Sequence, residues 1–169
     1  MDFTIHTLKW VKGELFEAAI ILGFGFATII AALLIWKIGT TSGSKALFWP
    51  FFVVGVIYVS IGAGMKFSNQ KRMTELPKSY HQDKIKFIST EKARVEGFQY
   101  GYLISKIVAT LFFVATLLIF WSTKNSTWQG IGIGLAYFAL AGLAVDYFSQ
   151  ERADSYYSVI VQYKIKALG

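Results

Sequence analysis

The chain has 169 residues, of which 54% are hydrophobic, with a net charge of +7 and a mean hydropathy of +0.48. This is too apolar for a soluble domain with one core. There is no cysteine, and both histidines lie outside the apolar stretches, so disulfides, iron–sulfur clusters and a haem held by transmembrane histidines of one chain are excluded. We therefore expect no cofactor and no metal site.

Four apolar stretches account for the high hydropathy. They lie at 18–36, 47–65, 103–121 and 128–147. Each is close to the ~20 residues that an α-helix needs to cross ~30 Å of hydrocarbon. The sequence predicts an all-α, multi-pass membrane protein with four transmembrane helices in two antiparallel hairpins, at 18–65 and 103–147. Within this single membrane domain of residues 1–169, residues 66–102 and 148–169 would form cytoplasmic, amphipathic helical arms.

The first 17 residues mix apolar and charged side chains without a regular spacing, which favours a short segment at the membrane interface. In the first span, Gly23, Ala27 and Ala31 follow one another at four-residue spacing and would share one helix face. Small side chains permit close helix packing in a bilayer, so we expect this face to contact a neighbouring helix. The alternative is that these residues reflect the general frequency of glycine in membrane helices.

A short polar turn at 39–44 predicts that the first two spans are antiparallel neighbours. Tryptophans flank this turn and the later one, and they are expected to mark one membrane face: Trp36, Trp49, Trp121 and Trp128. The second helix would continue past Arg72 and stop before Pro77, because the residue before a proline is disfavoured in the α region.

Part of the second unit repeats the first at a constant offset of 80 residues. Gly62, Gln70, Arg72, Gln82, Lys84, Ile85 and Lys86 recur as Gly142, Gln150, Arg152, Gln162, Lys164, Ile165 and Lys166. Either the chain contains two copies of one unit, or the matches arise by chance in sequence of low complexity. The repeated basic residues are candidate contacts of the arms with head groups or a partner: Arg72, Arg152, Lys84, Lys86, Lys164 and Lys166.

Lys106 is the most deeply placed charge, about one turn inside the third apolar stretch. We expect it to form an ion pair with Glu17 or Asp146, which would lie at similar depth, or to extend its ammonium to the interface. In the fourth span Gly130 and Gly134 form a GxxxG pattern. The polar side chains expected near mid-membrane form a second candidate cluster: Thr28, Tyr58, Ser60 and Tyr137.

The basic residues are distributed very unevenly along the chain. Fourteen of the 17 fall on the side of the predicted membrane that holds the termini and the central arm, and only Lys37, Lys45 and Lys124 fall on the other. The positive-inside rule then places both termini in the cytoplasm, with the chain integral to the plasma (inner) membrane. The basic surface would face anionic head groups.

The sequence has no phosphate-binding glycine loop, no paired metal ligands and no catalytic triad, so we expect no enzymatic activity. The function most consistent with these observations is a non-catalytic membrane protein whose basic arms bind lipid head groups or a partner protein, and not nucleic acid. Two alternatives stay open: an oligomeric channel or transporter for a neutral or hydrophobic solute, and a lipid-modifying enzyme. A homo-oligomer is compatible with each of them.

Overall fold

The computed structural model describes residues 3–168, with side chains to residue 165, and every element in this range is helical. The elements are α1 (Phe3–Ile38), α2 (Ser42–Ala46), α3 (Phe48–Gln82), α4 (Lys84–Ser122) and α5 (Ser126–Leu168). Four helical stretches are long and apolar enough to cross a membrane. The prediction of an all-α chain with four such helices is confirmed.

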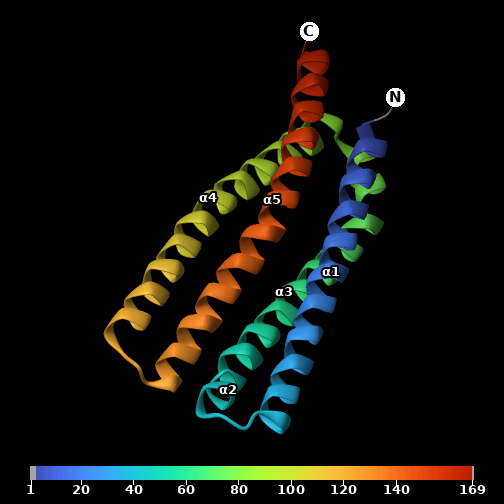
Figure 1. The fold of residues 1–169 in the computed structure, drawn as a ribbon. Helices are drawn as coiled ribbons and strands as arrows, with labels where there is room; N and C mark the ends of the chain where they lie inside the picture. Colours follow the sequence, from blue (N-terminus) through green and yellow to red (C-terminus); the bar gives the residue numbers. More distant parts are fainter. Residues whose placement is uncertain (1–2, 169) are drawn as a thin grey trace.

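The long helices form two pairs of antiparallel neighbours (Figure 1). One pair is α1 with α3 and the other is α4 with α5, and α5 faces the first pair. The connections between paired helices lie at one end of the molecule, and the chain termini lie at the other together with the link from α3 to α4. We call these the turn end and the terminal end.

Local capping fixes where several helices begin. Thr41 is the N-cap of α2, and its side chain and that of Ser44 bond each other's backbone N–H in a capping box, so the polar turn predicted at 39–44 is partly helical. Asp83 separates α3 from α4 with an extended backbone, and its carboxylate accepts a hydrogen bond from the backbone N–H of Lys86 at 2.9 Å. An N-cap of this kind satisfies one of the free donors of the helix start.

The helix α3 continues through Pro77 to Gln82, so the expected stop before the proline is wrong. Pro77 itself is exposed, whereas Leu76 and Tyr80 on either side are 4% and 8% exposed. Burial of these two side chains in the terminal core favours the helical path. That packing offsets the lost backbone hydrogen bond and the clash of the proline ring, which together cost about 3 kcal/mol in a helix interior.

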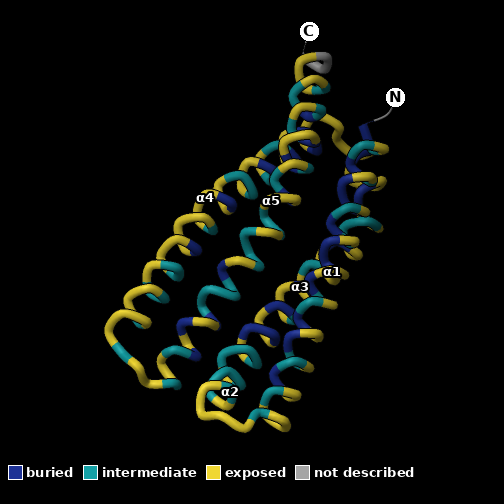
Figure 2. The backbone as a smooth tube through the Cα atoms, in the orientation of Figure 1, coloured by how far each residue is buried: buried dark blue, intermediate teal, exposed yellow. Residues whose placement is uncertain are grey.

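At the terminal end, all four long helices extend beyond their apolar stretches and pack around a shared core (Figure 2). This terminal core consists of Phe3, Trp10, Val11, Leu76, Tyr80, Phe87, Ile88, Val95, Tyr102, Ala153, Tyr156 and Ile160. The N-terminal residues that looked irregular belong to this core as the first three turns of α1. The arms are therefore direct continuations of the apolar helices.

The first pair is packed closely through glycine, but not through the face predicted. A Cβ added at Gly25 would lie 2.6 Å from the backbone nitrogen of Val59, and one at Gly55 or Gly62 would meet α1 equally closely. A Cβ at Gly23 meets nothing within 4 Å, and Ala27 is exposed. The expectation for the face of Gly23, Ala27 and Ala31 is wrong because the buried stripe of α1 is offset from it, through Ala18, Gly25, Thr28 and Ala32.

The buried positions of α4 repeat those of α1. Trp10, Val11, Glu14, Ala18, Gly25 and Ala32 are buried in α1, and the residues 77 positions later are buried in α4: Phe87, Ile88, Glu91, Val95, Tyr102 and Ala109. The offset between α3 and α5 is 80, as in the repeated arm residues. The matched positions of α4 and α5 are therefore three residues farther apart in sequence than those of α1 and α3.

Candidate functional site

Buried charges gather just inside the terminal end, where the two helix pairs meet. We call Glu14, Glu17, Arg72, Glu91 and Arg152 the polar junction. Glu14 and Glu91 are each 4% exposed, and Glu17 is 8% exposed. Charged side chains are almost never buried to this degree unless they are paired.

Each arginine of the junction connects one helix pair to the other. Arg72 on α3 binds Glu91 on α4, with the two side chains 16% and 5% exposed. Arg152 on α5 binds Glu17 on α1 and lies 3.6 Å from the Oε1 of Glu14. The two arginines found 80 residues apart in sequence thus make equivalent contacts, each from the second helix of its own pair to the first helix of the other.

Burial raises the pKa of Glu14, which lies one turn before the first apolar stretch. The positive charges of Arg152 and Arg72 act in the opposite direction, but desolvation is the larger effect. The carboxyl group of Glu14 is therefore easier to protonate than that of an exposed glutamate.

Tyr156 on α5 extends the junction into the terminal core. Its hydroxyl donates to the Oγ1 of Thr7 at 2.8 Å and lies 3.1 Å from the carboxylate of Glu91, while its ring stacks on that of Trp10. Burial, followed by the charge of Glu91, raises the pKa of Tyr156, so the phenol stays protonated and keeps its hydrogen to donate.

A cavity of about 530 Å³ lies beside the junction, between the two helix pairs. Four polar atoms buried along its lining have no hydrogen-bond partner among the described residues: Glu14 Oε1, Asn69 Oδ1, Arg94 Nη1 and Asp146 Oδ2. Three of these atoms are acceptors and one is a donor. Water molecules or the polar head of an amphiphile would satisfy them.

The ion pair predicted for Lys106 is not formed among the described residues. Its ammonium donates to the amide oxygen of Gln150 at 2.9 Å, while Glu17 binds Arg152. The guanidinium of Arg152 has several donors in a fixed plane, which suits two neighbouring carboxylates better than one flexible ammonium does. Asp146, the other predicted partner, also forms no ion pair with Lys106 among the described residues.

The predicted mid-membrane cluster is only partly brought together. The hydroxyls of Thr28 and Tyr137 lie 2.9 Å apart, linking α1 to α5, and the Tyr58 hydroxyl donates to the backbone oxygen of Phe138 at 2.8 Å. Ser60 is exposed and donates to its own helix at the backbone oxygen of Val56. Three of the four residues thus connect the two pairs, and Ser60 does not.

The predicted arm contacts divide into two groups. Arg72 and Arg152 are internal ties of the junction, and the lysines lie outside it. Lys84 stands over the ring of Tyr80 at 5.6 Å from its centre, and Lys86 and Lys164 are exposed. The side chain of Lys166 lies outside the described residues.

Sequence reasoning missed Glu14, Glu91, Asn69 and Tyr156 as members of the site. For Glu14 a signal did exist: the buried positions of α1 run 3, 7, 10, 14, 17, 21 and so share the three- and four-residue spacing of one helix face. The pattern is hidden when only apolar residues are counted, because Thr7, Glu14 and Glu17 occupy three of these positions.

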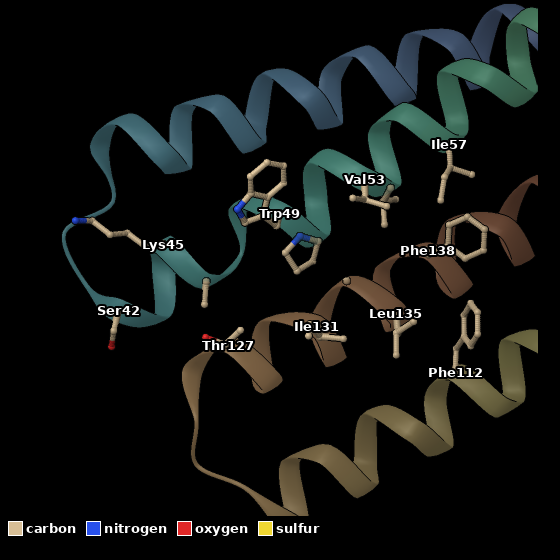
Figure 3. Close-up of a pocket in the computed structure, with 14 residues that line it drawn as sticks. Ser42, Lys45, Trp49, Val53, Ile57, Phe112, Thr127, Ile131, Leu135 and Phe138 are labelled. Carbon is tan, nitrogen blue, oxygen red and sulfur yellow. The ribbon is translucent and has the colours of Figure 1, made fainter.

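A second cavity, of about 820 Å³, forms a groove at the turn end between α3 and α5 (Figure 3). Trp49, Val53 and Ile57 of α3 line one wall, and Ile131 and Leu135 of α5 line the other. The two glycines of the GxxxG pattern bring α5 close to α2 and α3: a Cβ at Gly130 would lie 2.6 Å from the backbone oxygen of Ala46, and one at Gly134 would lie 2.5 Å from the Cβ of Pro50.

Comparisons with protein-family models, with curated proteins and with solved structures find no match to this chain.

Proposed function

We propose that this chain is a non-catalytic integral membrane protein that binds anionic lipid head groups through the exposed lysines of its terminal end. In this arrangement the four long helices cross the bilayer over their apolar stretches as two hairpins, both termini are cytoplasmic, and the terminal core stands in the cytoplasm. The membrane is the plasma (inner) membrane.

The proposal is supported chiefly by a difference between the arginines and the lysines of the terminal end. The arginines of the polar junction are occupied by buried carboxylates, whereas many lysines of the same end are exposed: Lys9, Lys12, Lys66, Lys71, Lys78, Lys84, Lys86, Lys106 and Lys164. Each lysine near an anionic membrane surface contributes about 1 kcal/mol of attraction.

We also infer that the chain consists of two copies of one helix pair. The support is the agreement of two independent patterns, the buried positions of α1 and α4 at offset 77 and the arm residues of α3 and α5 at offset 80. The equivalent contacts of Arg72 and Arg152 fit the same relationship. A duplicated unit explains why both arms carry the same basic pattern.

The proposal is tested by lipid selectivity in reconstituted vesicles. Spin-labelled phosphatidylglycerol and spin-labelled phosphatidylcholine are compared for the motionally restricted fraction that each shows around the protein. The triple variant Lys9→Gln, Lys12→Gln, Lys66→Gln should lose most of the preference for phosphatidylglycerol, and the matched triple Lys→Arg variant should retain it.

An unchanged preference in the glutamine variant would argue against head-group binding at this end. If the glutamine variant instead loses a stoichiometric protein that copurifies with the wild type, while its lipid preference is unchanged, the lysines serve a partner protein and the lipid proposal fails.

A further inference from the structure

The groove at the turn end is lined by large apolar side chains that the described part of the chain leaves uncovered (Figure 3). Trp49 is 67% exposed, Val53 is 50% exposed, and Ile57 and Ile131 are each more than a third exposed. Phe112 of α4 and Phe138 of α5 close the inner end of the groove. The walls are aliphatic and aromatic along most of its length.

The polar lining residues are confined to the outer end of the groove. They are Ser42 and Lys45 of α2 and Thr127 of α5. The hydroxyl oxygens of Ser42 and Ser126 lie 3.3 Å apart, so the two connections approach each other at this mouth. The groove thus has the polarity of an amphiphile, with one polar end and one long apolar end.

The length of the groove matches one leaflet of a bilayer. On α5 it runs from Thr127 to Phe138, which are 11 residues apart and span ~16 Å at ~1.5 Å per helical residue. Half of the ~30 Å hydrocarbon core is ~15 Å. A hydrocarbon chain that enters at the mouth therefore ends close to Phe112 and Phe138, at the middle of the membrane.

Charge at the mouth selects the head group. The sequence has no aspartate or glutamate between residues 18 and 74 or between residues 97 and 145, so the lysines of the turn end have no carboxylate within those ranges to balance them. Lys45 is exposed and lines the mouth, beside hydroxyls that donate hydrogen bonds. A phosphate can accept hydrogen bonds from hydroxyl and ammonium groups, and its charge complements that of Lys45.

We propose that this groove binds one acyl chain of an anionic phospholipid, with the phosphate held at Lys45 and the chain lying between α3 and α5. The inference rests on the membrane-spanning part of the proposed function and not on the lysines of the terminal end. Those lysines are left intact in the experiment, so a failure of the groove proposal can be distinguished from a failure of head-group binding at the terminal end.

The test is native mass spectrometry of the delipidated protein in detergent, titrated with phosphatidylglycerol and with phosphatidylcholine of identical chains. The wild type should retain one phosphatidylglycerol with higher affinity than phosphatidylcholine. Leu135→Trp fills the groove and should weaken binding at least tenfold. Leu140→Trp is the matched control, because Leu140 is 64% exposed on the same helix and does not line the groove. Lys45→Gln should reduce the preference for phosphatidylglycerol about fivefold, equivalent to about 1 kcal/mol.

A second measurement uses a protein with an unaltered groove, so that misfolding of Leu135→Trp cannot decide the result. Phosphatidylglycerol brominated on its acyl chain should quench the fluorescence of Trp49, measured as the difference between the wild type and Trp49→Phe. Equal lipid binding by Leu135→Trp and the wild type, or a Trp49 signal insensitive to bromine, overturns the proposal. A dimer that forms on delipidation and is lost in Leu135→Trp would also overturn it, since the occupant would then be a second copy of the chain.

Discussion

Arg152 on α5 binds the carboxylate of Glu17 on α1, so the last long helix of the chain is tied directly to the first, 135 residues away. Glu14 lies within 3.6 Å of the same guanidinium. One guanidinium therefore lies against two carboxylates that are each less than a tenth exposed.

Replacement of Arg152 by Met should lower the free energy of unfolding in detergent by about 2–4 kcal/mol, because it leaves buried carboxylates without a counter-charge. Adding Glu17→Gln to Arg152→Met should recover part of this loss. The matched control is Lys71→Met, which breaks an exposed pair with Glu75 and should change the stability by less than about 0.5 kcal/mol. Equal effects at the two positions would show that the junction does not depend on charge balance.

Tyr156 and its neighbour Tyr157 offer a direct comparison of a buried tyrosine with a partly buried one. Tyr156→Phe removes the donor to Thr7 and Glu91 and should cost about 1–2 kcal/mol in the same unfolding measurement. Tyr157→Phe removes a hydrogen bond to the exposed Glu96 and should cost little. A larger effect at Tyr157 would contradict the burial described for this end.

The close approach of α1 and α3 predicts that an alanine substitution lowers stability strongly at one glycine and not at another. Gly25→Ala should destabilise the protein by about 1–3 kcal/mol, because the added methyl would overlap the backbone of α3 at Val59, which cannot move aside as a side chain can. Gly64→Ala is the control, since its Cβ meets nothing within 4 Å. Thermal unfolding followed by circular dichroism separates the two, and a silent Gly25→Ala would mean that the helices are farther apart.

The raised pKa of Glu14 predicts how stability depends on pH. A carboxyl group that binds its proton more tightly in the folded state adds stability at low pH, and this contribution is lost as the pH rises from the ordinary glutamate value through the raised one. Glu14→Gln removes the titration, so the melting temperature of this variant should fall less over that interval than that of the wild type. Parallel curves for the two proteins would mean that Glu14 does not titrate there.

Cysteine labelling tests the orientation of the helices in this cysteine-free chain. Ser42, Ser79 and Asn125 are all exposed, so a cysteine at each position is accessible to a reagent in water. A membrane-impermeant maleimide should label Ser42→Cys and Asn125→Cys on intact cells, and Ser79→Cys only after permeabilisation. Labelling of Ser79→Cys alone on intact cells would reverse the proposed topology.

The number and type of the long helices could be predicted from the sequence because hydropathy reports directly on segments that avoid water. The same measure could not predict where the helices end. Helices α3, α4 and α5 run far past their apolar stretches, since the continuation depends on packing against residues distant in sequence. Pro77 shows this most clearly, because local preference predicts a stop that the terminal core overrides.

Only part of the polar junction could be predicted from the sequence, for a related reason. The repetition of Arg72 and Arg152 identifies them as candidates. Their partners lie 19 and 135 residues away, and no local sequence pattern identifies those partners. Similar depth in the membrane suggests Lys106 as a partner of Glu17, but depth does not show which face of its helix each residue occupies, and Glu17 binds Arg152 instead. The structure shows which face of α1 is buried, and Glu14 lies on that face with Trp10 and Ile21.

The tie between Glu17 and Arg152 also sets an order of events during synthesis. At ~5–20 residues per second, Arg152 leaves the ribosome about 7–27 s after Glu17 does. Within that interval α1 and α3 are complete, and Gly25, Gly55 and Gly62 can close their contacts without any later residue. Until Arg152 is available, the carboxylates of Glu14 and Glu17 must be hydrated or protonated. A nascent chain that stalls before Arg152 therefore holds a packed helix pair in which Glu14 and Glu17 lack the guanidinium that they contact in the finished protein.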